Sequence, residues 1–218
     1  MPIYDAAEYL PQAIDSVLDQ TYEDWELIAV DDNSPDLRVM DILDAITDRR
    51  VTVIHLETTE KKRWESVRYA AIINQSAAVS WGTYLTFLCG DDFYYPDRLE
   101  RMVAKLDEGN DVVYGPQRML NEDGTEFGIR SATEVLSNAY HQVDLNSVMV
   151  TRKAFENAGG FPTTPTEKGW READAHFWNR LTAQGYKFIP VDGSEPTDAK
   201  RYRADSVDQR VIRGETPW

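Results

Sequence analysis

PIYDAAEYLPQAIDSVLDQTYEDWELIAVDDNS, residues 2–34, predicts a strand, a helix and a second strand in that order. Met1–Tyr4 is the end of a strand, and Asp5 with Glu8 fits a capping box at the start of a helix. Trp25–Val30 is an apolar, β-rich run of strand length that stops at a cluster of turn residues. Apolar residues at helical spacing indicate the helix between them, namely Leu10, Ile14, Val17 and Leu18.

The alternation of strand and helix continues to about residue 115. Further strands are predicted at 51–56, 83–88 and 111–114, and further helices at 37–46, 64–79 and 96–107. The polar residues 57–63 form a loop between the third strand and the next helix. Four alternations predict an α/β fold with a mostly parallel central sheet flanked by helices.

The pattern becomes mixed after residue 115. Asn121–Gly124 predicts a hairpin turn. Strands are predicted at 143–150 and 186–191, and helices at 151–158 and 171–184. The tail from Asp192 is polar and is predicted to be rich in loops. We therefore divide the chain into an α/β half (1–115), a smaller mixed half of the same domain (116–191) and a polar tail (192–218).

Composition excludes several classes of partner. Hydrophobic residues make up 42% of the 218 residues, which suits a folded domain, and no apolar run approaches the roughly 20 residues of a membrane span. The formal charge of −15 argues against nucleic acid and anionic membranes as partners. No signal peptide is visible, and the single cysteine, Cys89, forms no intrachain disulfide. We therefore predict a cytoplasmic protein with no membrane span.

Charged residues follow three of the predicted parallel strands. Asp31 and Asp32 follow the second strand, Lys61–Arg63 follows the third, and Asp91 with Asp92 follows the fourth. Because the carboxyl ends of parallel strands meet at one edge, these residues predict a nucleotide site there. Adjacent carboxylates at an exposed strand end also suit a hard divalent cation. The alternative is that aspartates are turn residues, which for the first pair has about equal weight.

Competing signatures are missing from the sequence. It has neither a GxxxxGK[ST] phosphate loop nor a GxGxxG dinucleotide motif. Its three histidines lack metal-ligand spacing, and it has no cysteine pair for zinc.

The opening stretch and four later segments resemble family 2 glycosyltransferases, which have the GT-A fold. The later segments are RYAAIINQSAA, GTYLTFLCGDDFYYPDRLERMV, NSVMVTR and EADAHFW, which begin at residues 68, 82, 146 and 172. The similarity is greatest to the spore coat polysaccharide glycosyltransferase subgroup and covers residues 2 to about 190. It implies a transferase that moves a sugar from a UDP or dTDP donor to a hydroxyl of a glycan or other acceptor, with Mg²⁺ or Mn²⁺ as cofactor.

The resemblance also implies roles for six residues. Tyr4 resembles the aromatic residue near the nucleotide base, Asp32 the carboxylate that hydrogen-bonds the base, and Arg63 the arginine beside base and ribose. Asp91 resembles the ribose-contacting aspartate of the metal motif, and Asp92 its metal-binding partner. Residues 1–115 would then bind the nucleotide sugar, and residues 116–191 would bind the acceptor and carry the base.

The sixth residue, Asp174, resembles the catalytic base of inverting members. It lies in the first turn of the predicted helix 171–184, where the helix dipole favours an ionised carboxylate. Glu172 is the rival carboxylate, but two residues along a helix turn it to another side. The alternative role for Asp174 is that of a helix-capping aspartate.

Two other functions stay open. A nucleotidyltransferase shares this fold class, but it usually has a loop rich in glycine and lysine where this chain has Asp5-Ala6-Ala7. A weakly active or inactive homologue that binds nucleotides or glycans is the second alternative, because the first strand is short and the metal motif begins with Cys89. Cys89 is either a soft metal ligand or a buried strand-end residue. A homo-oligomer is compatible with the sequence.

Overall fold

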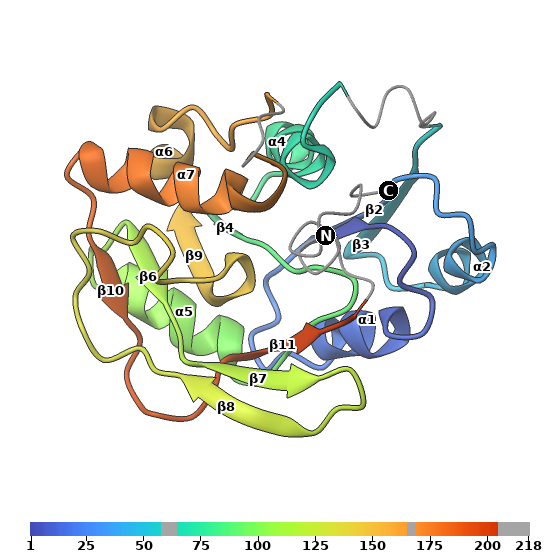
Figure 1. The fold of residues 1–218 in the computed structure, drawn as a ribbon, viewed down its shortest axis with the longest axis horizontal. Helices are drawn as coiled ribbons and strands as arrows, with labels where there is room; N and C mark the ends of the chain where they lie inside the picture. Colours follow the sequence, from blue (N-terminus) through green and yellow to red (C-terminus); the bar gives the residue numbers. More distant parts are fainter. Residues whose placement is uncertain (58–64, 165–168, 205–218) are drawn as a thin grey trace.

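A computed structural model describes residues 1–57, 65–164 and 169–204 (Figure 1). In these residues three sheets form, with strand orders β1-β2-β3, β10-β6-β9-β4 and β5-β11-β7-β8. Their strands are β1 Pro2–Ile3, β2 Leu27–Asp31, β3 Val51–His55, β4 Tyr84–Thr86, β5 Phe93–Tyr94, β6 Val112–Tyr114, β7 Gln117–Asn121, β8 Glu126–Arg130, β9 Val148–Thr151, β10 Phe188–Pro190 and β11 Asp198–Tyr202. The first sheet is wholly parallel, and β9 runs antiparallel to both of its neighbours.

Helices pack against the parallel sheet and against both faces of the sheet that contains β6 and β9. They are α1 Leu10–Leu18, α2 Arg38–Asp44, α4 Arg68–Val79, α5 Arg98–Asp107, α6 Arg152–Asn157 and α7 Gly169–Ala183, with a 3-10 turn, η1, at Leu145–Ser147. In Figure 1, α4, α6 and α7 lie along the upper side of the molecule, and α1 and α5 lie below them. The predicted α/β fold is therefore confirmed, with two mixed sheets added to the parallel one.

Alternation along the strands divides the core into two. Val148 and Val150 of β9 point into the cluster under α4, α6 and α7, whereas Met149 points into the cluster formed with α1, α2 and α5. Successive strand residues face opposite sides, so a sheet with helices on both faces needs apolar residues at every position. The run VMV satisfies that need.

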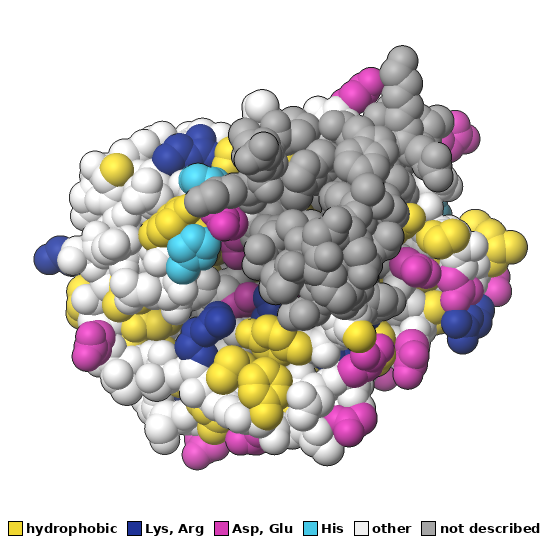
Figure 2. All heavy atoms as spheres, in the orientation of Figure 1, with side chains coloured by type: hydrophobic (Ala, Val, Ile, Leu, Met, Phe, Trp, Pro, Cys, Tyr) yellow, Lys and Arg dark blue, Asp and Glu magenta, His cyan; other side chains and the backbone are white. Residues whose placement is uncertain are grey.

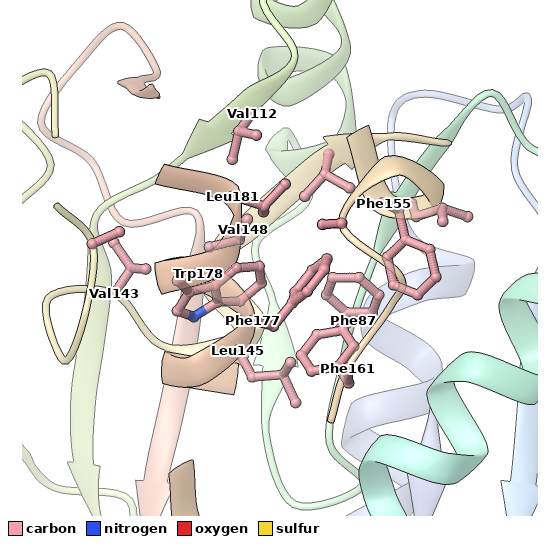
Figure 3. Packing of buried hydrophobic residues seen from close by; sticks show 14 of the residues in the cluster. Phe87, Val112, Val143, Leu145, Val148, Phe155, Phe161, Phe177, Trp178 and Leu181 are labelled. Atoms are coloured by element: carbon pink, nitrogen blue, oxygen red, sulfur yellow. The ribbon is translucent and has the colours of Figure 1, made fainter. Parts of the chain in front are cut away.

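An aromatic cluster fixes α7 on the upper face (Figure 3). Phe177 lies 4.4 Å from Phe161 between ring centroids, and Trp178 packs edge-on against Phe188. Ala173, Phe177 and Leu181 recur every four residues on α7, and all three are fully buried. Because this face is anchored, the first regular turn of α7, which carries Asp174, has a defined position.

Several local predictions change in the structure. The capping box at Asp5 does not form: α1 begins at Leu10, Asp5 has a φ of 50°, and its N–H donates to Ser34 Oγ. The helix predicted from residue 64 begins at Arg68, because Val67 is extended and its N–H bonds Thr163 O. The hairpin turn is confirmed, with Gly124 at a φ of 84° between β7 and β8.

The strand predicted at 143–150 is shorter than expected. The 3-10 turn η1 occupies Leu145–Ser147, and β9 begins only at Val148. Asp144 caps η1 by accepting the N–H of Asn146, so this polar segment satisfies its backbone locally instead of through a ladder.

The tail predicted as loop from Asp192 contains a strand. Residues Asp198–Tyr202 form β11, which pairs in parallel with β7 over five positions and antiparallel with β5. Asp198 and Ala199 are fully buried, so tertiary burial overrides the polar composition of this segment. The division of the chain at residues 115 and 191 stays a prediction.

No helix in the described residues has the length and apolar character that a bilayer span requires.

Candidate active site

The turn after β4 carries the aspartate pair into the edge of the fold. Gly90 lies against the β1–α1 connection, where a Cβ would stand 3.3 Å from Ala6 Cβ and 3.5 Å from Ile3. This close approach needs a small residue, and it places Asp91 and Asp92 beside the carboxyl end of β1. Asp91 is half-buried, whereas Asp92 is 4% exposed. The predicted exposure of Asp92 is therefore wrong, because η1 and β11 cover it.

Two protein donors hold the Asp92 carboxylate. Asn146 Nδ2 donates to Oδ2 at 2.5 Å, and the Arg201 main-chain N–H donates to Oδ1 at 2.7 Å. Asn146 also donates to Asp144 Oδ1 at 3.2 Å and accepts the Cys89 N–H at 3.0 Å. The Asn146 side chain is 1% exposed, and both its oxygen and its nitrogen are hydrogen-bonded. It therefore links Cys89 to Asp92 and orients the Asp92 carboxylate.

Negative charge is concentrated around Asp92. Burial raises the pKa of Asp92 well above its usual range, and the neighbouring Asp91 raises it further, while Lys200 opposes both. Burial likewise raises the pKa of the Cys89 thiol, with Asp92 and Asp91 adding to the effect. A cation beside this group would favour the ionised carboxylate.

The motif fits a hard divalent cation on its aspartates. Cys89, Asp91 and Asp92 each offer one ligand atom, and these atoms lie within 4.8 Å of one another. The raised pKa keeps Cys89 a neutral thiol, which is a poor ligand for Mg²⁺ or Mn²⁺. Each aspartate oxygen has lone pairs left for a metal, and such ions keep water and phosphate oxygens as further ligands.

A buried polar network supports the motif from below. Lys200 Nζ donates to Asp144 Oδ2 and, against the effect of burial, holds the pKa of Asp144 below its usual value. Gln117 Nε2 donates to Asp144 Oδ1 at 3.2 Å and to Asp198 Oδ2 at 2.7 Å. Burial raises the pKa of Asp198 to about 6. The network fixes β7, β11 and η1 behind Asp92.

Asp32 is bound by an arginine that the sequence interpretation missed. Arg68 donates from Nε to Oδ2 at 3.0 Å and from Nη2 to Oδ1 at 2.5 Å, and Asp32 is 1% exposed. Arg68 opens α4, so this bidentate pair ties the end of β2 to the start of that helix. Arg63, which the resemblance placed at the base, lies outside the described residues.

Asp31 and Tyr4, which lie near Asp32, differ in their surroundings: Asp31 is hydrogen-bonded within a turn, and Tyr4 is exposed. Asp31 Oδ1 accepts both the N–H and the Oγ–H of Ser34, at 3.0 and 2.6 Å, so Asp31 holds the turn after β2. Tyr4 follows β1 and is 38% exposed.

The two carboxylates on α7 occupy different surroundings. The helix is kinked at Glu172, which has a φ of −124°, so Asp174 lies in the first regular turn after the kink. The Asp174 N–H donates to Tyr69 Oη at 3.3 Å. Glu172 instead accepts from Tyr140 Oη at 3.1 Å, with His176 Nε2 4.0 Å away. Tyr69 follows Arg68, so the start of α4 contacts both the Asp174 turn and Asp32.

One face carries these groups together. Figure 2 shows acidic, basic and histidine side chains on the face between α7 and β11. Five further residues contact the predicted ones or their supports: Asn146, Arg201 and Arg203 contact the aspartate motif, Arg68 contacts Asp32, and Lys200 contacts Asp144. The only sequence signal for Lys200, Arg201 and Arg203 is the basic run in the acidic tail, which was interpreted as loop.

A separate cavity of about 420 Å³ lies between β2, β4 and α4. Its lining includes Leu27, Ile73, Leu85 and Met149, and it contains none of the predicted site aspartates, namely Asp31, Asp32, Asp91, Asp92 and Asp174. The cavity is therefore distinct from the candidate active site.

A TM-score of 0.69 relates the fold to the crystal structure of S. aureus TarS 1-349 in complex with UDP. The two are 17% identical in sequence, and the match covers 94% of this chain and 60% of that one. At this identity the likeness supports the fold alone, which is of the GT-A type.

Sequence comparison gives the family. Protein CgeD of Bacillus subtilis (strain 168) is 32% identical over 231 residues, which cover 97% of this chain and 54% of CgeD. TuaG of the same strain, named as a teichuronic acid biosynthesis glycosyltransferase, is 32% identical over 127 residues, or 57% of this chain and 47% of TuaG. The chain thus spans about half the length of these relatives. A model of Glycosyl transferase family 2 matches residues 1–186, and the chain belongs to that family.

Proposed function

We propose that the chain is an inverting, metal-dependent glycosyltransferase that moves a sugar from a UDP or dTDP donor to a hydroxyl acceptor. The observation that carries this is the aspartate pair after β4, with Asp92 held by Asn146 and the Arg201 N–H at the edge where Asp32 also lies. A rigid, acidic strand-end motif of this kind suits a cation and a nucleoside diphosphate. The chain spans about half the length of CgeD, and the activity of the whole protein is part of this proposal.

The nucleoside would lie along the carboxyl ends of β1 and β2. Asp32, oriented by Arg68, would accept an N–H of uracil or thymine, and Tyr4 would contact the base. Asp91 would accept from the ribose hydroxyls, while Arg63 stays a prediction from the resemblance. The solved complex of TarS with UDP supports a uridine donor by analogy of fold.

Asp91 and Asp92 would hold Mg²⁺ or Mn²⁺ with oxygens of the donor diphosphate. The bound ion would supply charge neutralisation for the leaving diphosphate. Asn146 and the Arg201 N–H both bond the Asp92 carboxylate, which would orient it for the ion before the donor arrives.

Asp174 would act as the base on the acceptor side. It would take the proton of the acceptor hydroxyl as that oxygen bonds to the anomeric carbon. The bond from the anomeric carbon to the diphosphate oxygen breaks on the opposite side, which inverts the configuration. Glu172 accepts a hydrogen bond from Tyr140, whereas the main-chain N–H of Asp174 contacts Tyr69 at the start of α4. The name of TuaG supports polysaccharide or glycoconjugate synthesis as the setting.

The test is nucleotide release from a panel of UDP- and dTDP-sugars, with Mn²⁺ and with EDTA. We expect Mn²⁺-dependent release of the nucleoside diphosphate, which is lost in Asp92→Asn. Asp48→Asn is the matched control, because Asp48 precedes β3 at the opposite end of the parallel sheet and pairs with Arg50. Metal-dependent binding without release would favour a non-catalytic homologue. Pyrophosphate release from a nucleoside triphosphate would favour a nucleotidyltransferase.

A further inference from the structure

Strand β11 and the residue that follows it bring two arginines to the aspartate motif. The strand pairs antiparallel with β5, which begins one residue after Asp92, so its second half runs beside the motif. The Arg201 N–H bonds Asp92 directly, and Arg203 follows two residues later. Both guanidinium groups lie over the ring of Tyr9, at 4.6 and 5.2 Å from its centroid. Tyr9 thereby holds the two cations as a pair.

Arg201 has no carboxylate partner among the described residues, although the chain carries a charge of −15. Its Nη2 donates to Gln12 Oε1 at 3.0 Å, and its Nη1 donates to the main-chain oxygen of Asp91 at 3.4 Å. Its buried Nε has no acceptor in residues 1–57, 65–164 and 169–204. A guanidinium with only neutral partners keeps its full charge for an anion.

Arg203 connects the two loops predicted to hold the nucleotide. Its Nη1 lies 3.3 Å from Asp91 Oδ2, and its Nη2 donates to the main-chain oxygen of Asp5 at 3.3 Å. Asp5 adjoins Tyr4, and Asp91 is the predicted ribose contact. Arg203 therefore lies between the expected base and ribose positions and the metal motif.

The other described cations at the site have dominant carboxylate partners. Arg68 is bidentate on Asp32, and Lys200 is bonded to Asp144. A nucleoside diphosphate brings about two negative charges or more to an edge that already holds four aspartates, and such charges need local compensation. Arg201 on β11 and Arg203, one residue after the strand, are the cations that contact the aspartate motif itself.

We propose that Arg201 and Arg203 bind the diphosphate of the nucleotide donor and stabilise it as the leaving group. This inference rests on the proposed function. The planar guanidinium donates two parallel hydrogen bonds to phosphate oxygens, which suits an extended diphosphate. The two arginines would bind the diphosphate from the β11 side, next to the metal proposed on Asp91 and Asp92.

The test compares UDP with uridine by titration calorimetry, each in Mn²⁺ and in EDTA. We expect Arg201→Gln and Arg203→Gln to weaken UDP binding roughly ten- to hundredfold, with uridine affinity changed less than about threefold. In EDTA the unchanged chain should still bind UDP, although more weakly than in Mn²⁺. Both variants should lose this metal-independent binding. Arg50→Gln removes the same charge at the far end of the sheet, where Arg50 stacks on Trp25, and should bind both ligands normally.

The outcomes separate the two claims. Wild-type UDP affinity in Arg201→Gln and Arg203→Gln would overturn the inference and leave the proposed function intact. An equal loss for uridine would overturn it too, because the arginines would then shape the nucleoside pocket. No binding of either UDP or dTDP by the unchanged chain would overturn the proposed donor itself. If Arg203→Gln melts early, Arg203→Lys and Arg201→Gln provide the readout, since lysine keeps the charge.

Discussion

Replacing Asn146 with alanine should remove the hydrogen bonds that join Asp92 and Cys89 of the aspartate motif to η1. The substitution removes three hydrogen bonds: two from Nδ2 to Asp92 and Asp144, and one from the Cys89 N–H to Oδ1. Asn146 is 1% exposed, so water does not readily replace them. A buried polar group left without its partner costs about 1–3 kcal/mol, so we expect a loss of about 3–5 kcal/mol in the free energy of unfolding.

That loss is large against the about 5–15 kcal/mol that stabilises a typical domain. For a chain of this size it corresponds to a fall in melting temperature on the order of 10 °C, measured by calorimetry or circular dichroism. Asn157→Ala is the control, because Asn157 is exposed and donates one hydrogen bond to Tyr186 Oη at 2.9 Å. We expect it to cost less than about 1 kcal/mol.

The same residue should affect metal binding separately from stability. Asn146→Asp keeps the shape of the side chain but places a third carboxylate between Asp92 and Asp144. We expect it to melt early without metal and to gain more melting temperature from Mn²⁺ than the unchanged chain does, because the cation relieves the repulsion. If Asn146→Ala melts within a degree or two of the unchanged chain and retains its Mn²⁺-dependent UDP binding, the positioning role is refuted.

Three further changes test the site. Asp174→Asn should lower turnover about 10²–10⁴-fold with nucleotide affinity and stability retained, whereas near-normal turnover there combined with loss in Glu172→Gln would identify the other carboxylate. Asp92→Asn should abolish the Mn²⁺-dependent part of UDP binding measured by calorimetry, and unchanged dependence would remove Asp92 as a ligand. Burial raises the pKa of Asp198 from 3.8 to about 6, so the native state binds the extra proton and stability should fall by about 2 kcal/mol as pH rises from 4 to 6. Urea unfolding across that range should show this slope diminished in Asp198→Asn, and an identical slope would contradict the assignment.

Local features of the structure agree best with the sequence patterns. The β-rich run at 25–30 and the hairpin turn at Gly124 appear where their residues predict them, because strand propensity and positive φ act within a few residues. The ends of elements shift where a distant partner intervenes. Val67 is held extended by Thr163, so α4 starts later than its apolar spacing indicates. Asp198–Tyr202 became a strand because β7 was available to pair with it.

The sequence by itself determined the alternation of strands and helices, the family, and the carboxylates at one edge of the fold, since these follow from periodicity, turn residues and motifs that are local in the chain. Only the tertiary structure decided that Asp92 is buried, that Arg68 pairs with Asp32, and that Arg201 of β11 and Arg203 after it contact the motif. The contacts responsible join residues 54 apart for Asn146 and Asp92, and 112 apart for Arg203 and Asp91. Such pairings depend on which distant segments the packed core brings together, and no local propensity records that choice.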